Sequence, residues 1–95
     1  MTFAYQIFGH FLADKKETHE FLAKFNKTFE PWTGLISRTV LDVPDDQIVS
    51  VLYICEDLES ALMGKKRVHG LIEQYDKQVG FNTEFIFEVN DNRSF

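Results

Sequence analysis

The sequence predicts an α+β fold with the element order β-α-β-β-α-β, in which a four-stranded antiparallel sheet carries two helical regions on one face. Three observations predict it. Four segments have the apolar pattern of strands, and two segments between them place apolar residues at helical spacing behind an Asp cap. Turn-forming residues separate the second and third strands closely enough for a hairpin. This order is the split βαβ, or ferredoxin-like, arrangement.

The first strand is expected at residues 3–13 and the first helix directly after it. Successive strand residues point to opposite faces, and one face of this strand carries Ala4, Gln6, Phe8, His10 and Leu12. Asp14 with Glu17 three residues later is a capping-box pattern, and apolar residues follow at helical spacing at Phe21, Leu22, Phe25 and Phe29. Pro31 ends this helix, because the residue before a proline is pushed out of helical conformation.

The second and third strands are expected at 35–43 and 48–55, with Pro44, Asp45 and Asp46 forming the turn between them. Asp57 then caps a second helical region that reaches Val79. Its segment "GKKRVHG" contains two glycines, each of which weakens a helix by about 1 kcal/mol relative to Ala. A short helix, a break and a longer helix are therefore expected, followed by the fourth strand at 81–89.

Composition limits the possible functions. The 95 residues predict a single domain over 1–95, and the formal charge of −5 disfavours nucleic acid and anionic membranes as partners. One Cys excludes an internal disulfide, and no apolar run approaches the roughly twenty residues of a membrane span. Because the first residues lack a secretory signal pattern, a cytoplasmic location is expected.

The first three strands are apolar on both sides, although two helices can cover only one face of the sheet. In the third strand, Ile48, Leu52 and Ile54 alternate with Val49, Val51, Tyr53 and Cys55. Burial of each large apolar side chain stabilises the fold by roughly 1.5–3 kcal/mol, so leaving the second face of the sheet exposed to solvent would be unfavourable. A second copy is the simplest cover, and a homodimer through the sheet face is predicted.

The stretches "PWTGLISRTVL" and "LYICEDLESAL" occur at the entry to the second strand and between the third strand and second helix. In these stretches and in element order, the chain resembles the dimeric α/β-barrel superfamily, and within it the antibiotic-biosynthesis-monooxygenase-like (ABM) domains. The resemblance implies a sheet-to-sheet homodimer. It also implies an activity like that of family members that are cofactor-independent, quinone-forming monooxygenases or heme-degrading enzymes. Other members have no established activity.

The chain departs from the family pattern at several positions. Many ABM-like domains carry a Trp near the end of the third strand, where Cys55 or Glu56 stands here. The pattern of the heme-degrading branch includes an Asn, a Trp and a His that ligates iron. Of these three residues, only the His has a counterpart in this chain, at His69. No metal cluster, phosphate loop or nucleophile motif is present in the sequence, and no cofactor is expected.

Two histidines are catalytic candidates. His69 lies beside Lys65, Lys66 and Arg67, where it would serve as general base or iron ligand, or as part of a solvated turn. His10 shares a strand face with Gln6 and Phe8, where it would orient a substrate oxygen or form a hydrogen bond at the sheet margin. His19 is expected at the surface.

Trp32 and Tyr53 are candidates to line a pocket between sheet and helices, together with Gln6 and Phe8. The alternative for Trp32 is that it packs between helix and sheet. Arg38 is expected to meet an acid across the strands or the dimer. Cys55 is expected to be a small buried hydrophobe rather than a nucleophile.

Two function classes remain open. One is a cofactor-independent monooxygenase-like enzyme that acts on a small phenol or hydroquinone, with His10 or His69 as base. The other is a non-enzymatic homodimer that binds a small ligand or a partner protein. Heme binding or degradation is a third class.

Overall fold

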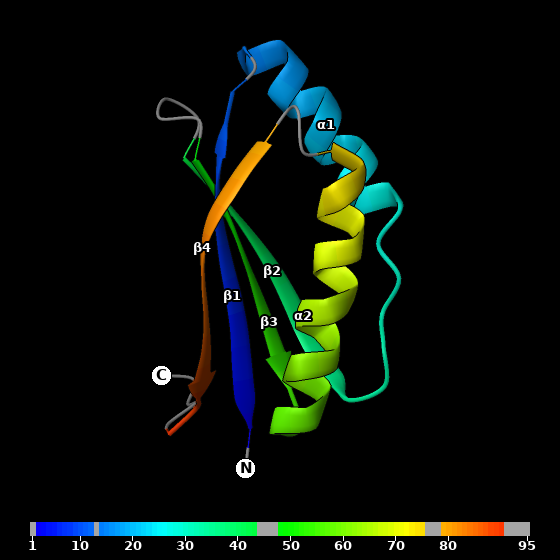
Figure 1. Ribbon diagram of the computed structural model, residues 1–95, viewed down its shortest axis with the longest axis vertical. Coiled ribbons are helices and arrows are strands. Elements are labelled where there is room, and N and C mark those ends of the chain that lie inside the picture. The colour runs from blue at the N-terminus through cyan, green and yellow to red at the C-terminus, as the bar shows by residue number, and fades with distance from the viewer. Residues whose placement is uncertain (1, 13, 44–47, 76–78, 91–95) are drawn as a thin grey trace.

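The computed structural model describes residues 2–12, 14–43, 48–75 and 79–90. Its elements are β1 (Phe3–Phe11), α1 (Lys15–Lys27), β2 (Leu35–Val43), β3 (Ile48–Cys55), α2 (Leu58–Ile72), a 3₁₀ turn (Glu73–Tyr75) and β4 (Val79–Glu88), as Figure 1 shows. The predicted element order and the ferredoxin-like fold are confirmed.

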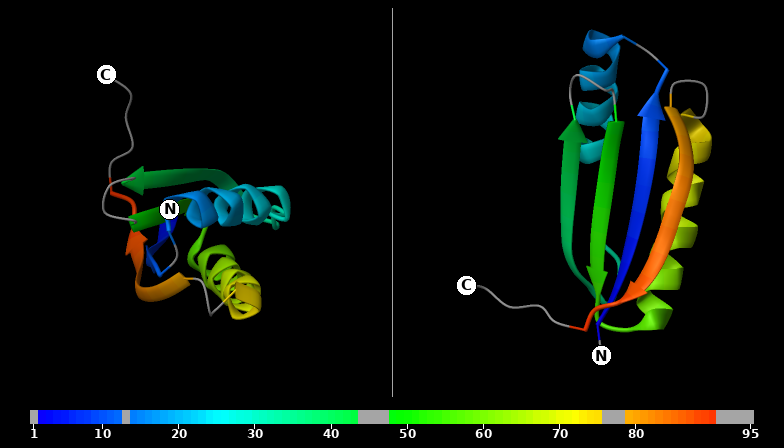
Figure 2. Two further views of the ribbon diagram at one scale, coloured as in Figure 1. Left: turned by 90° about the horizontal axis from the view of Figure 1, so that it is seen from above. Right: turned by 90° about the vertical axis from the view of Figure 1, so that its left-hand side faces the viewer.

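The sheet has the strand order β2-β3-β1-β4, and all neighbouring strands are antiparallel. Both helices lie on one face of the sheet and leave the opposite face uncovered (Figure 2). Between the sheet and the helices lies the core, to which β1 contributes Tyr5, Ile7 and Phe11 and β3 contributes Val49, Val51, Tyr53 and Cys55. The alternation predicted from sequence therefore assigns the two faces of these strands correctly.

Both predicted helix caps are present. The Asp14 carboxylate accepts a hydrogen bond from the Glu17 backbone N–H at 2.9 Å, and the Asp57 carboxylate accepts one from the Ser60 N–H at 2.8 Å. Each carboxylate also lies at the positive end of a helix dipole. Hydrogen bonds to Ser60 hold the pKa of Asp57 below its usual range. Both helices thus begin where the sequence predicts.

The predicted break in the second helical region is wrong. Residues 58–72 form one continuous α-helix, because burial of Ala61 and Val68 against the sheet outweighs the weak helix propensity of Gly64 and Gly70. The predicted end of the second helical region at Val79 is also wrong, because α2 ends at Ile72 and Val79 begins β4. β1 ends at Phe11, before the predicted boundary, and the predicted turn residues 44–46 lie outside the described residues.

The two glycines of α2 have different surroundings. A Cβ on Gly64 would lie 2.2 Å from the Trp32 ring atom Cζ2, whereas a Cβ on Gly70 would meet nothing within 4 Å. The close approach of α2 to the sheet therefore depends on Gly64. Gly70 has no such role.

Gly64→Ala and Gly70→Ala should change the free energy of unfolding in opposite directions. Gly70→Ala is expected to stabilise the protein by about 0.5–1 kcal/mol through helix propensity. Gly64→Ala should destabilise it by about 1–2 kcal/mol, because the cost of overpacking the new methyl group against Trp32 exceeds the gain in helix propensity. Urea unfolding of both variants tests this, and stabilisation by Gly64→Ala would contradict the packing.

The uncovered side of the sheet, here called the open face, is rich in apolar side chains. Three of them, Leu41, Phe85 and Phe87, are 48%, 48% and 43% exposed. Half-buried neighbours on the same face are Phe8, Ile48, Leu52 and Ile54. A sheet face with this many exposed apolar side chains is typical of an interaction site rather than of a solvated sheet.

No helix among the described residues is long and apolar enough to cross a membrane.

Candidate functional site

Four residues form a row across the sheet on its helix side. Arg38 of β2 pairs with Tyr53 of β3, Tyr53 pairs with Tyr5 of β1, and Tyr5 pairs with Ile86 of β4. We call this set the cross-strand row. The two tyrosine rings are stacked with centroids 5.7 Å apart, and both side chains are fully buried. Trp32, which precedes β2, adds a third ring 5.2 Å from that of Tyr53.

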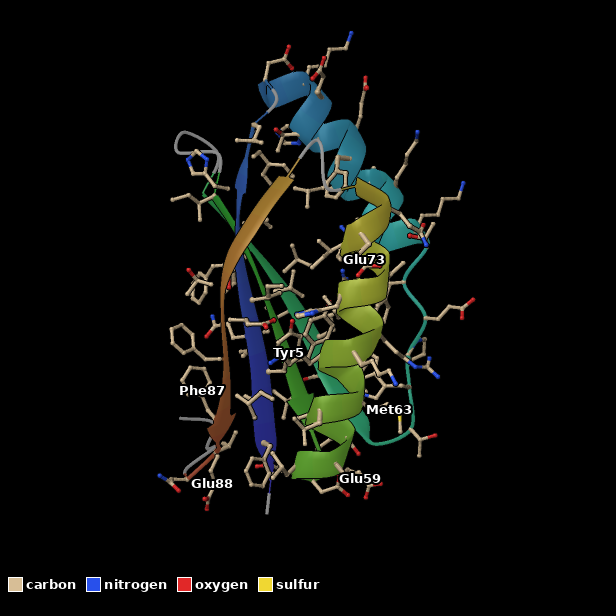
Figure 3. The ribbon with its side chains drawn as sticks, viewed as in Figure 1. Tyr5, Glu59, Met63, Glu73, Phe87 and Glu88 are labelled. Carbon is tan, nitrogen blue, oxygen red and sulfur yellow. The ribbon has the colours of Figure 1, made fainter. Side chains whose placement is uncertain are left out.

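A carboxylate closes one end of this aromatic layer. Glu84 Oε2 of β4 accepts a hydrogen bond from the Tyr5 hydroxyl at 2.7 Å and lies 2.6 Å from His69 Nε2 of α2. Lys65, one helical turn before His69, places its Nζ 3.4 Å from Glu84 Oε1. We call these four residues the Glu84 network. It connects a buried phenol to an imidazole that is 47% exposed, and Figure 3 shows Tyr5 between the sheet and α2.

The surroundings of Glu84 and Tyr5 shift the pKa values of these two residues in opposite directions. Burial opposes ionisation of Glu84, but hydrogen bonds from His69 and Tyr5 outweigh it and hold the pKa of Glu84 below its ordinary 4.5. Burial and the adjacent carboxylate raise the pKa of Tyr5 far above its ordinary 10.0. At neutral pH, Glu84 is therefore an anion that accepts hydrogen bonds, and Tyr5 is a neutral donor.

The lowered pKa of Glu84 predicts how stability depends on pH. A carboxylate with a depressed folded pKa contributes stability that is complete above pH 4.5 and is lost as pH falls through the lower folded value. The difference in unfolding free energy between the wild type and Glu84→Gln should therefore shrink below pH 4.5. Urea unfolding at pH 7 and pH 3 measures it, with the exposed Glu88→Gln on the same strand as control. A difference that does not change with pH would contradict the network.

Trp32 packs between α2 and the sheet, as one of the two sequence alternatives predicts. Its side chain is 6% exposed and lies against Gly64 on one side and Tyr53 on the other. Cys55 is fully buried, as expected, and burial raises the pKa of its thiol. A protonated, buried thiol is a poor nucleophile.

Arg38 does not meet an acid across the strands within the described part of the chain, so that one of its two predicted alternatives is wrong, and an acid from a second copy stays a prediction. Its guanidinium carbon lies 4.5 Å from the ring centroid of Phe29 and 5.6 Å from that of Phe25, and Nη2 donates a hydrogen bond to Asn26 Oδ1 at 2.8 Å. The side chain therefore faces the helix layer rather than the open face. Aromatic rings and a neutral amide take the place of a carboxylate partner.

The other sequence candidates lie on the opposite side of the sheet. Phe8 and His10 line a cavity of about 460 Å³ on the open face, together with Gly9, Ile48, Thr83 and Phe85. Gln6 lies on the same face and donates a hydrogen bond to Ser50 Oγ at 3.1 Å. The six predicted site residues are thus divided by the sheet: Gln6, Phe8 and His10 on one side, and Trp32, Tyr53 and His69 on the other.

Sequence reasoning missed two residues on the helix side, Tyr5 and Glu84, and considered Arg38 only as an ion-pair partner. Glu84 had a usable signal, because it is a charge within the apolar strand segment "FNTEFIFEV". No signal placed it beside His69, since that contact depends on how α2 packs over β4. The residues described in the structure include no group of His, Cys, Asp and Glu that would hold a metal ion.

Solved structures with the same fold include a cofactor-independent oxygenase. SnoaB from Streptomyces nogalater, described by that activity, aligns with a TM-score of 0.70 at 12% identity over 96% of this chain and 95% of its own. A dimeric ferredoxin-like protein from an uncultured marine organism aligns with a TM-score of 0.79 at 16% identity, covering 99% of this chain and 92% of that one. The protein YJCS aligns at 0.66 and 14% identity, over 95% and 100%.

These alignments show a shared ferredoxin-like fold, the fold that the sequence resemblance implied. No family profile matches the sequence, and no curated protein matches it. Because fold does not determine function, the activity has to be argued from the side chains.

Proposed function

We propose that the chain is a homodimeric, cofactor-independent monooxygenase-like enzyme that oxidises a small phenol or hydroquinone in the layer between the sheet and the helices. The observation that carries the proposal is the Glu84 network. A carboxylate contacts an exposed imidazole at 2.6 Å at the edge of an aromatic layer. An imidazole oriented by a carboxylate is a common general base.

In this proposal His69 removes the phenolic proton of the substrate. Glu84 is a positioning residue, because it orients the ring and stabilises the imidazolium that forms. The buried Tyr5 hydroxyl donates a second hydrogen bond to the Glu84 carboxylate and so holds it in place. Trp32 and Tyr53 provide apolar surface against which an aromatic ring packs.

The reaction needs no external reductant. A phenol that loses its proton becomes electron-rich enough to react with molecular oxygen. One oxygen atom enters a ring carbon in place of hydrogen, and the other leaves as water, so that phenol plus oxygen gives quinone plus water. The substrate supplies all four electrons. The protein would contribute deprotonation, orientation and exclusion of water.

The open face supports the dimer in this proposal. A second copy would cover its exposed Leu41, Phe85 and Phe87, and two-fold symmetry would bring the same patch from each chain together. One solved structure with this fold is described as dimeric. The chain's acidic charge favours neither nucleic acid nor an anionic membrane as the covering partner.

Oxygen uptake tests the enzymatic proposal. Chelator-treated protein is mixed with a panel of naphthols and hydroquinones in an oxygen electrode, and quinone formation is followed by absorbance. Uptake above that of heat-denatured protein is expected for at least one phenol. No uptake across the panel would contradict the proposal.

The open-face cavity favours a second candidate, a non-enzymatic dimer that binds a small apolar ligand. Its lining is apolar apart from His10 and Thr83, and its 460 Å³ are within the range of small-molecule sites. A partner copy would close it. Binding of a hydroquinone that His10→Ala abolishes, without turnover, would favour this function.

A further inference from the structure

Arg38 has an unusual environment for a positive charge. It is half-buried on the helix side of β2, and three aromatic rings surround its guanidinium, those of Phe25, Phe29 and Tyr53. Rings attract a cation through their faces, but they do not neutralise its charge. Arg38 forms no salt bridge among the described residues. The salt bridges there join Glu84 to Lys65 and to His69.

Two hydrogen-bond donors beside this charge have no acceptor. Within the described part of the chain, neither the Arg38 Nε–H nor the Tyr53 O–H has an acceptor, and both atoms are buried. Burial raises the pKa of Tyr53, and the Arg38 guanidinium beside its oxygen opposes that rise through a hydrogen bond and its charge. The Tyr53 side chain has no exposed surface. A buried polar group without a partner destabilises the folded protein. The two residues are direct cross-strand partners, so their unpaired donors belong to one location.

We infer that Arg38 and the Tyr53 hydroxyl bind a carboxylate group, and that small aromatic acids are a class of ligand for this chain. A carboxylate accepts several hydrogen bonds at once and would satisfy both donors and the charge. The aromatic part of the same ligand would pack on the rings of the cross-strand row. β2 is an edge strand, so this location is close to solvent.

This site lies at the β2 end of the cross-strand row, opposite the Glu84 network on β4, so the inference goes beyond the proposed function and does not depend on oxygen chemistry. Its test is a comparison of 2-naphthoate with the neutral 2-naphthamide, which has nearly the same shape. Binding is followed by titration calorimetry and by fluorescence of Trp32, the single tryptophan, whose ring lies 5.2 Å from that of Tyr53. The wild type is expected to bind the acid at least tenfold more tightly than the amide.

Arg38→Met should remove this preference, whereas Arg38→Lys should keep part of it because the charge remains. Arg67→Met, at an exposed arginine of α2, is the matched control and should leave the preference unchanged. Circular dichroism establishes that each variant is folded, and Tyr53→Phe gives a second route if Arg38→Met does not fold. Equal binding of acid and amide by the wild type would overturn the inference, as would no binding of the acid at millimolar concentration or a preference that survives Arg38→Met. Binding of the acid, while no phenol of the panel supports oxygen uptake, would instead contradict only the enzymatic proposal.

Discussion

Phe85→Asp is expected to convert the proposed dimer into folded monomers, with the dissociation constant raised at least 100-fold. Phe85 is 48% exposed on the open face and packs edge-on against Phe8 at 6.4 Å and stacks with Phe87 at 5.5 Å. Two-fold symmetry introduces the charge twice in each dimer, and an unpaired buried charge costs about 3–5 kcal/mol. Sedimentation velocity over a range of concentrations measures the change against the chain mass of 11.1 kDa.

Leu62→Asp is the matched control for this variant. Leu62 is 50% exposed, nearly the same as Phe85, but it lies on α2, on the opposite side of the sheet. The control should remain dimeric. A wild type that is monomeric at micromolar concentration would contradict the dimer, as would a Leu62→Asp variant that dissociates as readily as Phe85→Asp.

His69→Ala is expected to lower kcat for a turned-over phenol by about 10²–10⁴, the usual contribution of a general base. Glu84→Gln should have a smaller effect, about tenfold to 100-fold, because His69 remains but loses its charged partner. Added imidazole should restore part of the His69→Ala activity. It should not restore Glu84→Gln.

The other two histidines provide controls. His10→Ala tests the open-face cavity, and His19→Ala tests an exposed position on α1. Both variants should retain nearly full activity if the reaction takes place on the helix side. Loss of activity in His10→Ala, with His69→Ala unaffected, would move the active site to the opposite face of the sheet.

The fold could be predicted from sequence because its signals are local. Strand alternation and the caps at Asp14 and Asp57 each act over a few residues, and both were read correctly. The predicted stop at Pro31 was too late, because α1 ends at Lys27 and Thr28 caps it. The error in α2 came from applying local propensity alone. Gly64 weakens the helix by itself, but it permits the contact with Trp32 that holds the helix on the sheet.

The site could be predicted only in part, because it depends on contacts between distant segments. His69, Trp32 and Tyr53 could be selected by residue type. Which face of the sheet each would occupy depended on register, and His10 and Tyr53 point to opposite faces although both lie on apolar strands. The contact of Glu84 with Tyr5 joins residues 79 positions apart, and no local pattern encodes it.

The most direct test of the central claim, that ligands bind on the helix side, is an NMR titration of the uniformly ¹⁵N-labelled protein with a small phenol. The sequence contains one tryptophan, so its indole N–H gives a single signal that reports on the cross-strand row. The account predicts that this signal and the amide signals of Tyr5, Arg38 and Tyr53 shift together and saturate. A stationary indole signal, with shifts confined to Phe8, His10 and Phe85, would contradict it.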